Sequence, residues 1–200
     1  QAFLGWYMVK SGLVDIPAVS HYRLAAHLLT AFGIIFYIYW IIMRLTESPI
    51  VKNKKIRNLS FVLIGIVVIQ ITLGAFVAGL KAGYLTPING GWIKSVFWYN
   101  FGQHGNFSLL NNPYDIQATH RFFAWFVLAF TSVLYWACKN TKLTKTANLM
   151  IGIVILQIVL GIITLISRIN IPIAIAHQLF AVILLLSVSR ISYLSNADSQ

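Results

Sequence analysis

The sequence predicts an all-α integral membrane protein, and three observations carry that prediction. Of the 200 residues, 58% are hydrophobic and only 10% are charged, whereas soluble domains have about 25% charged residues. The apolar residues form five segments close to the roughly 20 residues that a helix needs to cross a bilayer. The basic residues fall between those segments, as they do in membrane proteins.

The five predicted spans cover residues 20–45, 59–80, 116–138, 147–167 and 171–189. Residues 1–9 resemble the end of a further membrane helix, and Gly12, Asp15 and Pro17 then mark a loop. Since the chain starts at Gln1 with no signal peptide before that helix, we expect its natural N-terminus to lie upstream.

The net charge of +11 first suggests nucleic acid as a partner, but the positions of the basic residues argue against it. One group lies between the first two spans and another between the third and fourth. These groups are Lys52, Lys54, Lys55 and Arg57, and Lys139, Lys142 and Lys145. This is the positive-inside pattern. Loops 46–58 and 139–146 are therefore expected on the cytoplasmic or matrix side, and nucleic acid is not an expected partner.

Three histidines occur in similar surroundings near the predicted outer ends of apolar segments. His27 begins His-Leu-Leu-Thr-Ala, His177 begins His-Gln-Leu-Phe-Ala, and His120 begins His-Arg-Phe-Phe-Ala-Trp. A histidine inside a bilayer is costly without a partner, and neutral imidazole is a common axial ligand of haem iron. The pattern predicts haem held between helices. The alternative is three histidines that hydrogen-bond to neighbouring groups.

The chain also repeats itself. Gln-x-x-Leu-Gly occurs at residues 1–5, 70–74 and 157–161. After the first and third copies, an Ile-Pro pair and then an Ala-His pair follow. Such self-similarity predicts two homologous helical bundles.

The predicted bundles divide the chain. Residues 59–189 are expected to form a C-terminal four-helix transmembrane bundle with an outer loop at 84–115. Residues 1–45 are expected to be the remnant, namely the last two helices, of a second, pseudo-symmetric four-helix bundle. The basic loop 46–58 joins the two, and residues 190–200 form a cytoplasmic tail.

His120 and His177 lie in the same predicted bundle and are the strongest pair of candidate iron ligands. Two histidines on opposite faces of a haem leave no open position on iron, so such a haem carries electrons and does not bind oxygen. The partner of His27 is expected in the missing part of the other bundle.

Three basic residues are candidates for binding the propionates of a haem. Arg121 follows His120 directly, and Arg23 shares a helix face with His27. Lys81 lies at the outer end of its helix. Arginine binds carboxylate in a two-pronged geometry. The alternative for each side chain is that it reaches toward lipid headgroups.

Acidic side chains are expected outside the membrane. All four are placed in loops or tails: Asp15, Glu47, Asp115 and Asp198. An ion-coupled transporter is expected to keep an acid at depth, so transport is disfavoured. No catalytic motif of a soluble enzyme is present either.

A stripe of small residues and two further histidines receive plainer interpretations. Ala75, Gly79 and Gly83 recur at four-residue spacing, and helix packing explains them better than the approach of a flat macrocycle. His21 falls on a different helix face from His27, and His104 lies in the outer loop. Neither is expected to bind iron.

Several motifs carry a resemblance to a known family. They are LGWYMVKSGL at residues 4–13, YRLAAH at 22–27, LGAFVAGLKAG at 73–83, His120-Arg121 and Ala176-His177. On these motifs the chain resembles the haem A synthase family (CtaA in bacteria, Cox15 in mitochondria). The resemblance covers essentially the whole chain.

The resemblance implies a fold and a reaction. It implies eight helices in two pseudo-symmetric bundles, and an oxidoreductase that converts a methyl group of haem O to the formyl group of haem A for cytochrome oxidase. It implies a haem b cofactor held by His120 and His177 as the electron relay. His27 is implied to be one of two histidines at the iron of the substrate haem, where catalysis occurs.

The resemblance also implies what this chain lacks. The family's first two helices, with their histidine and a nearby catalytic glutamate, have no match here, so the 200 residues alone are expected to be inactive. The expected partners are haem O, haem O synthase, cytochrome oxidase assembly factors and the lipid bilayer. The expected location is the inner membrane of a bacterium or mitochondrion, with the three histidines near the outer side.

The alternative function is a b-type transmembrane cytochrome that carries electrons without modifying haem. A further alternative is a haem-carrying subunit without redox turnover.

Overall fold

The computed structural model describes residues 1–10, 19–85 and 108–196, and within these ranges the chain is helical. Among the described residues, five helices are long and apolar enough to cross a membrane. This confirms the predicted all-α membrane class. The elements are α1 (Ala2–Val9), α2 (His21–Thr46), α3 (Lys54–Gly79), the 3-10 helix η1 (Ala82–Leu85), α5 (Pro113–Cys138), α6 (Thr144–Ile166) and α7 (Ile171–Leu194).

The helices extend past the predicted spans at their polar ends. The side chain of Asn53 accepts the amide of Ile56 at 3.1 Å, which starts α3 five residues before the apolar run. Asn112 caps α5 in the same way by accepting the amide of Tyr114 at 3.0 Å. Capping side chains satisfy amides that have no partner within the helix. The apolar run therefore underestimates the length of both helices.

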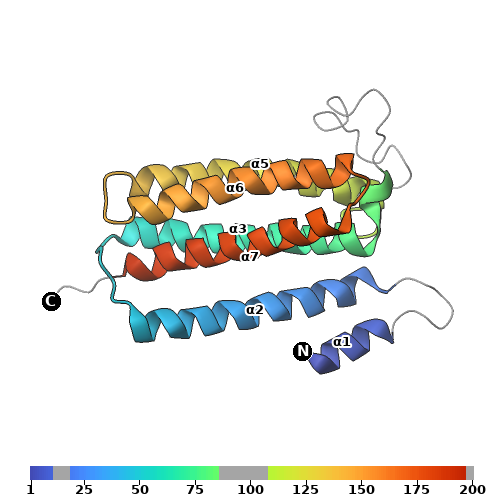
Figure 1. Ribbon diagram of the computed structural model, residues 1–200, viewed down its shortest axis with the longest axis horizontal. Coiled ribbons are helices and arrows are strands. Elements are labelled where there is room, and N and C mark those ends of the chain that lie inside the picture. Colours follow the sequence, from blue (N-terminus) through green and yellow to red (C-terminus); the bar gives the residue numbers. More distant parts are fainter. Residues whose placement is uncertain (11–18, 86–107, 197–200) are drawn as a thin grey trace.

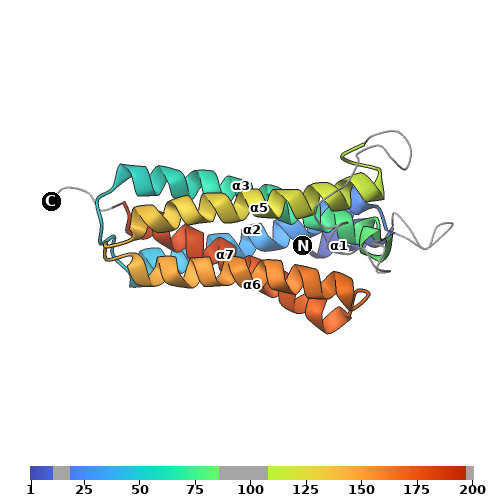
Figure 2. The same cartoon turned by 90° about the horizontal axis from the view of Figure 1, so that it is seen from above.

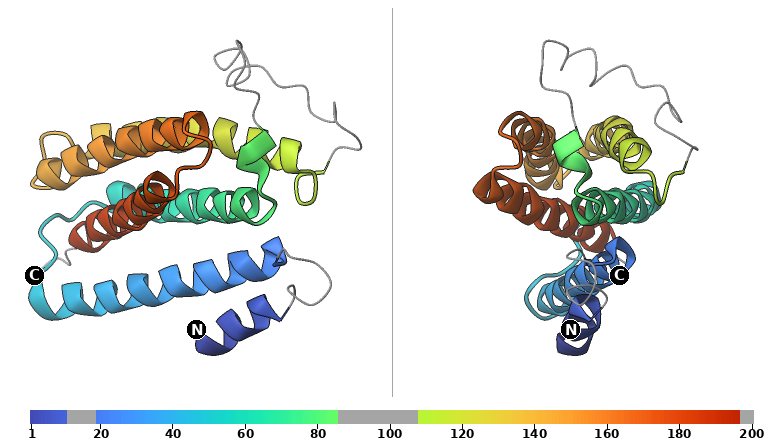
Figure 3. Two further views of the ribbon diagram at one scale, coloured as in Figure 1. Left: turned by 45° about the vertical axis from the view of Figure 1, so that its right-hand side comes forward. Right: turned by 90° about the vertical axis from the view of Figure 1, so that its right-hand side faces the viewer.

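Four helices form a closed ring. Helix α3 packs on α5 and α7, and α6 packs on the same two helices. Helices α5 and α7 therefore occupy opposite corners, as the end-on view in Figure 3 shows. Figure 2 shows the long helices running along one common direction.

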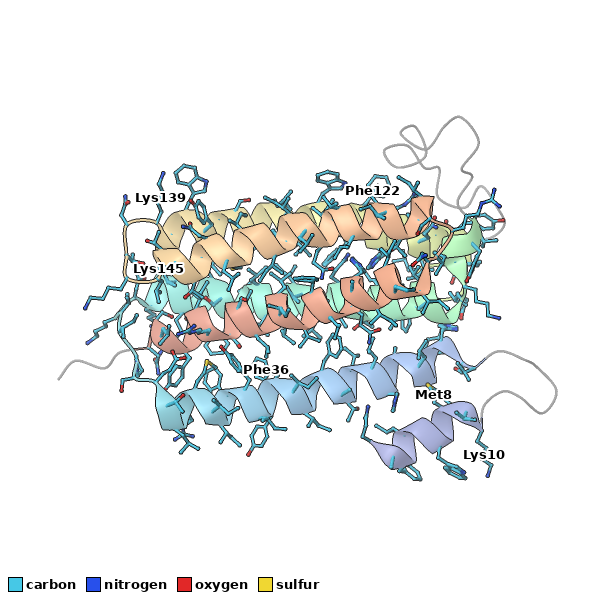
Figure 4. All side chains as sticks on the ribbon, in the orientation of Figure 1. Met8, Lys10, Phe36, Phe122, Lys139 and Lys145 are labelled. Carbon is cyan, nitrogen blue, oxygen red and sulfur yellow. The ribbon has the colours of Figure 1, made fainter. Side chains whose placement is uncertain are left out.

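The N-terminal helices lie outside this ring. Helix α2 packs on α3 and α7, and α1 packs on α2, below the ring in Figure 1. Helices α2, α5 and α7 all begin at the same end of the molecule, which we call the histidine end. The labelled side chains Lys139 and Lys145 mark the opposite end in Figure 4, which we call the lysine end.

The main hydrophobic core fills the half of the ring nearer the lysine end. Its buried side chains come from all four ring helices, as in Leu63, Leu134, Met150 and Val188. Residues 155–183, all of them described, include no buried residue. The buried side chains near the histidine end come instead from α2, α3, η1 and α5, and form a smaller cluster of Ala25, Ala75, Phe76, Ala82 and Ile116.

The linker between α2 and α3 is tied to the end of α7. Glu47 forms an ion pair with Arg190 at 3.0 Å, and the hydroxyl of Tyr193 donates to the Glu47 carbonyl at 2.8 Å. The amides of Ile50 and Val51 both donate to the carbonyl of Leu194. These bonds fix the N-terminal helices to the ring at the lysine end.

Candidate functional site

The three histidines singled out above lie at one end of the molecule. His27 and His177 are the seventh residues of α2 and α7, and His120 is the eighth residue of α5. Because these helices begin at the same end (Figure 1), the histidines lie at similar heights along the bundle.

Each imidazole packs against a glycine of the preceding helix, where an added Cβ would contact the ring, tightly at Gly74 and Gly5 and at an ordinary distance at Gly161. A Cβ added at Gly74 would lie 3.0 Å from Cε1 of His120. A Cβ at Gly161 would lie 3.4 Å from Cε1 of His177, and one at Gly5 would lie 3.3 Å from that of His27. These glycines end the three copies of Gln-x-x-Leu-Gly. The repeat and the histidines are therefore parts of one arrangement.

The glutamine that begins each copy makes the same hydrogen bond. The amide Nε2 of Gln1 donates to the main-chain carbonyl of His27 at 3.1 Å. Gln70 donates likewise to the carbonyl of His120 at 3.0 Å. We call this unit the histidine module: a Gln-x-x-Leu-Gly segment on one helix and the histidine that it contacts on the next. The third module pairs Gln157 with the carbonyl of His177 at 2.7 Å.

The two ring nitrogens of each histidine have different surroundings. Nδ1 of His27, His120 and His177 is enclosed and has no hydrogen-bond partner among the described residues. Nε2 of His27 lies 3.5 Å from the side-chain amide of Gln1. A neutral imidazole binds a metal through one ring nitrogen, and with Nδ1 enclosed against the neighbouring helix, Nε2 is the candidate atom.

His120 and His177 make the most complete site. They stand on the two helices at opposite corners of the ring and are near enough to interact electrostatically. At this end α6 and α7 contribute no buried side chain. Two imidazoles on helices at opposite corners of a ring fit the axial ligation of a flat macrocycle.

A bare metal ion fits less well. In the described part of the chain, no three side chains of His, Cys, Asp or Glu come together. A structural zinc site needs about four such ligands, whereas a haem supplies its own four nitrogen ligands and needs only axial ones. The donor set therefore favours haem.

The three candidate propionate ligands have different surroundings. Arg121 is half-buried next to His120. Arg23 on α2 donates from Nη1 to the main-chain carbonyl of Tyr7 at 3.0 Å, and its Cζ lies 3.8 Å from the centroid of the Tyr7 ring. Arg23 therefore holds α1 against α2. Lys81 follows α3, is exposed, and has a φ of 52°.

The expectation that every acid lies in a loop or tail was wrong for Asp115. It lies in the first turn of α5, is fully buried, and accepts the amide of Ser108 at 3.0 Å. The cap at Asn112 starts the helix earlier than the apolar run does, and a carboxylate is favourable at a helix N-terminus. Asp15 and Asp198 lie outside the described residues, as does His104.

The small-residue stripe serves packing, as expected, but between different elements. A Cβ at Gly79 would lie 2.5 Å from Cβ of His21, so Gly79 lets α2 approach α3. Gly83 is not in α3 at all: it lies in η1 and faces Ile169 of the α6–α7 turn.

The fold and the site together define a class: a multi-helix membrane protein built from repeated histidine modules suited to haem. The comparisons place it more closely. The sequence model of the COX15-CtaA family, described as cytochrome oxidase assembly protein, matches residues 1–189. The chain belongs to this family.

Curated relatives share this family and are longer. The chain is 43% identical over 193 residues to a protein named Heme A synthase from Wolbachia pipientis wMel, covering 92% of the chain and 53% of that protein. It is 37% identical over 199 residues to the Heme A synthase of Pelagibacter ubique (strain HTCC1062), covering 96% of the chain and 58% of that protein. The chain thus spans about half the length of these relatives. No solved structure matches it.

Proposed function

We propose that this chain is part of a haem A synthase, an oxidoreductase that converts a methyl group of haem O to the formyl group of haem A for cytochrome oxidase. The observation that carries the proposal is the pair of matching modules at His120 and His177, on opposite corners of the ring and at the end where α6 and α7 bury no side chain. The names of the relatives supply the reaction.

His120 and His177 hold a haem b through their Nε2 atoms. Haem b supplies one-electron redox chemistry when bound. The packed core beneath the site closes the ring against water from the lysine end. Oxidising a methyl group releases electrons that must leave the substrate, and two opposed imidazoles make this site a carrier and not an oxygen-binding centre.

His27 serves the substrate haem. It stands in a module of its own, on α2, outside the ring that carries the other two. We place the remaining ligand of that site, with its catalytic acid, in the part of the relatives that this chain does not span. The 200 residues alone then bind haem b and do not turn over haem O.

The charged residues at the histidine end fit haem propionates. Arg121 beside His120 is the first candidate, and Lys81 and Arg23 are the others, since guanidinium and ammonium groups attract carboxylates.

The partners we propose are haem O as substrate, haem O synthase as its source, and cytochrome oxidase assembly factors. The location is a bacterial or mitochondrial inner membrane, with the histidine end on the outer side.

Haem extraction from cells with and without the full-length gene tests the reaction. Loss of haem A together with build-up of haem O is the expected result. The second candidate, a b-type cytochrome that only carries electrons, is favoured by the same opposed pair. It predicts unchanged haem A in those cells, and that outcome would replace the enzyme with the carrier.

A substitution separates the two haem sites. In the full-length protein, His27→Ala is expected to abolish haem A formation and to leave the C-terminal haem in place, because His27 belongs to a different module. Product analysis and the optical spectrum of the purified variant measure the two effects. Normal activity in this variant contradicts the assignment of His27 to the substrate.

A further inference from the structure

We propose that Gln70 and Gln157 are positioning residues that fix the height at which His120 and His177 present their imidazoles to iron. This rests on the proposed function, which makes those histidines iron ligands. Each glutamine acts through the main chain of the histidine and does not touch the haem. Gln1 stands in the same relation to His27.

The hydrogen bond reaches the one backbone group whose position defines the ligand residue. A carbonyl oxygen has two lone pairs, so the carbonyl of a helical histidine can serve its own helix and still accept the glutamine amide. No water reaches the interior of a bilayer, and a lost hydrogen bond there leaves a costly unpaired group. The bond therefore resists sliding of α5 along α3, and of α7 along α6.

The glycine of the same segment adds a second restraint. Gly74 lies four residues after Gln70, on the same face of α3 and one turn further on. The glutamine fixes the height of the histidine, and the glycine fixes how closely its ring approaches, since a Cβ added at Gly74 would lie only 3.0 Å from Cε1 of His120. Together they hold the imidazole plane in one orientation.

The same arrangement occurs in three helix pairs, which a chance contact does not explain. Two other glutamines of the described chain differ. Gln117 is buried and donates to the carbonyl of Ala82 at 3.0 Å, which is not the carbonyl of a histidine. Gln178 is exposed, although it directly follows His177. These two serve as matched controls.

The test replaces each glutamine with methionine, which keeps the volume and removes the donor. Gln70→Met and Gln157→Met are made in the full-length protein, with Gln178→Met and Gln117→Met beside them. The readouts are retention of haem b, the electron paramagnetic resonance spectrum of the ferric haem, and helix content by circular dichroism.

The expected result is specific to the modules. Gln70→Met and Gln157→Met are expected to retain haem about 10- to 100-fold less tightly, as losing a group that orients a metal ligand does. Their ferric spectra are expected to shift, because the imidazole planes are released, while helix content stays as in the wild type. Both controls are expected to keep the wild-type spectrum.

Three outcomes overturn the proposal. The first is an unchanged spectrum and unchanged haem retention in both module variants. The second is an equal shift in Gln117→Met, which makes the effect a general loosening of the helices. The third is loss of helix content along with haem, which makes the glutamines structural. A wild-type protein without a bis-histidine haem overturns the proposed function itself, and this shows before any variant is made.

Discussion

The two halves of the four-helix ring are built on opposite principles. Toward the lysine end, the main core of buried side chains, such as Leu63, Leu134 and Val188, comes from all four ring helices. Toward the histidine end, residues 155–183 of α6, α7 and their turn contribute no buried side chain, and the buried cluster there is smaller. The first half is packed by the chain alone, and the second is the half in which we propose that haem binds.

The difference teaches where the stability of such a protein resides. Close-packed side chains hold the helices together without any ligand, so the packed half can define the ring in the absence of haem. The histidine half contributes hydrogen bonds that set positions, as from Gln157 to the carbonyl of His177. Substitutions in the two halves should therefore have separable effects on stability and on haem binding.

The largest separation is expected from the ligands themselves. His120→Ala and His177→Ala should each abolish the low-spin bis-histidine spectrum and leave helix content unchanged, because the packed half does not depend on haem. Optical spectra and circular dichroism of the purified proteins measure both. His21→Ala, at the same end but on α2, serves as the control and should keep the spectrum. A full bis-histidine signal in both ligand variants would show that the assignment is wrong.

The reverse effect is expected from the core. Leu134→Ala should lower the free energy of unfolding by about 2–5 kcal/mol, since it opens a cavity in a packed interior, and should leave the haem spectrum in place. Leu134 is 0% exposed, whereas Leu179 in the other half is 58% exposed. Leu179→Ala is thus the matched control. Denaturant unfolding in detergent compares them, and equal losses would contradict the division into two halves.

Two glycines of α3 sharpen the comparison further. Gly74→Ala places a methyl group against His120, so the haem spectrum should change with little loss of stability. No side chain or neighbouring helix in the described part of the chain lies within 4 Å of a Cβ added at Gly65. Gly65→Ala should therefore raise stability by about 0.5–1 kcal/mol through lower entropy of the unfolded chain and leave the spectrum unchanged. Identical spectra for the two variants would remove the steric role of Gly74.

The smallest effect is expected at the lysine end. The side chains of Arg190 and Glu47 are 42% and 29% exposed, and ion pairs of this kind contribute about 0–1 kcal/mol. Glu47→Gln should therefore change the unfolding free energy by no more than that and leave the haem unaffected. Thermal unfolding of wild type and variant at low and high salt gives the measurement. A loss of haem in this variant would tie the linker to the site.

The positions of the spans followed from the sequence because the apolar runs are long, and the three histidines followed because their surroundings repeat. The helix ends did not follow, because side-chain caps such as Asn53 and Asn112 decide them. The burial of Asp115 could not be foreseen either, since it depends on which segments cover the start of α5.

The sequence shows the glutamine of each histidine module as a repeated residue, but it does not show which group that glutamine contacts. Whether Gln70 reaches the carbonyl of His120 depends on the relative height of two helices, and hydrophobic periodicity carries no information on that height. The signal that could have revealed it is the equal place of Gln1, Gln70 and Gln157 within the three copies of Gln-x-x-Leu-Gly.

The hydrogen bonds from Ile50 and Val51 to the carbonyl of Leu194 have a consequence for the order of assembly. The linker emerges early in synthesis, yet its partner is the last turn of the last helix. The N-terminal helices can insert beforehand, but the linker can form these hydrogen bonds to the ring only after α7 has been synthesised. Since α7 also carries His177, the proposed pair of iron ligands is completed and the linker is bound to the ring at the same late moment of biogenesis.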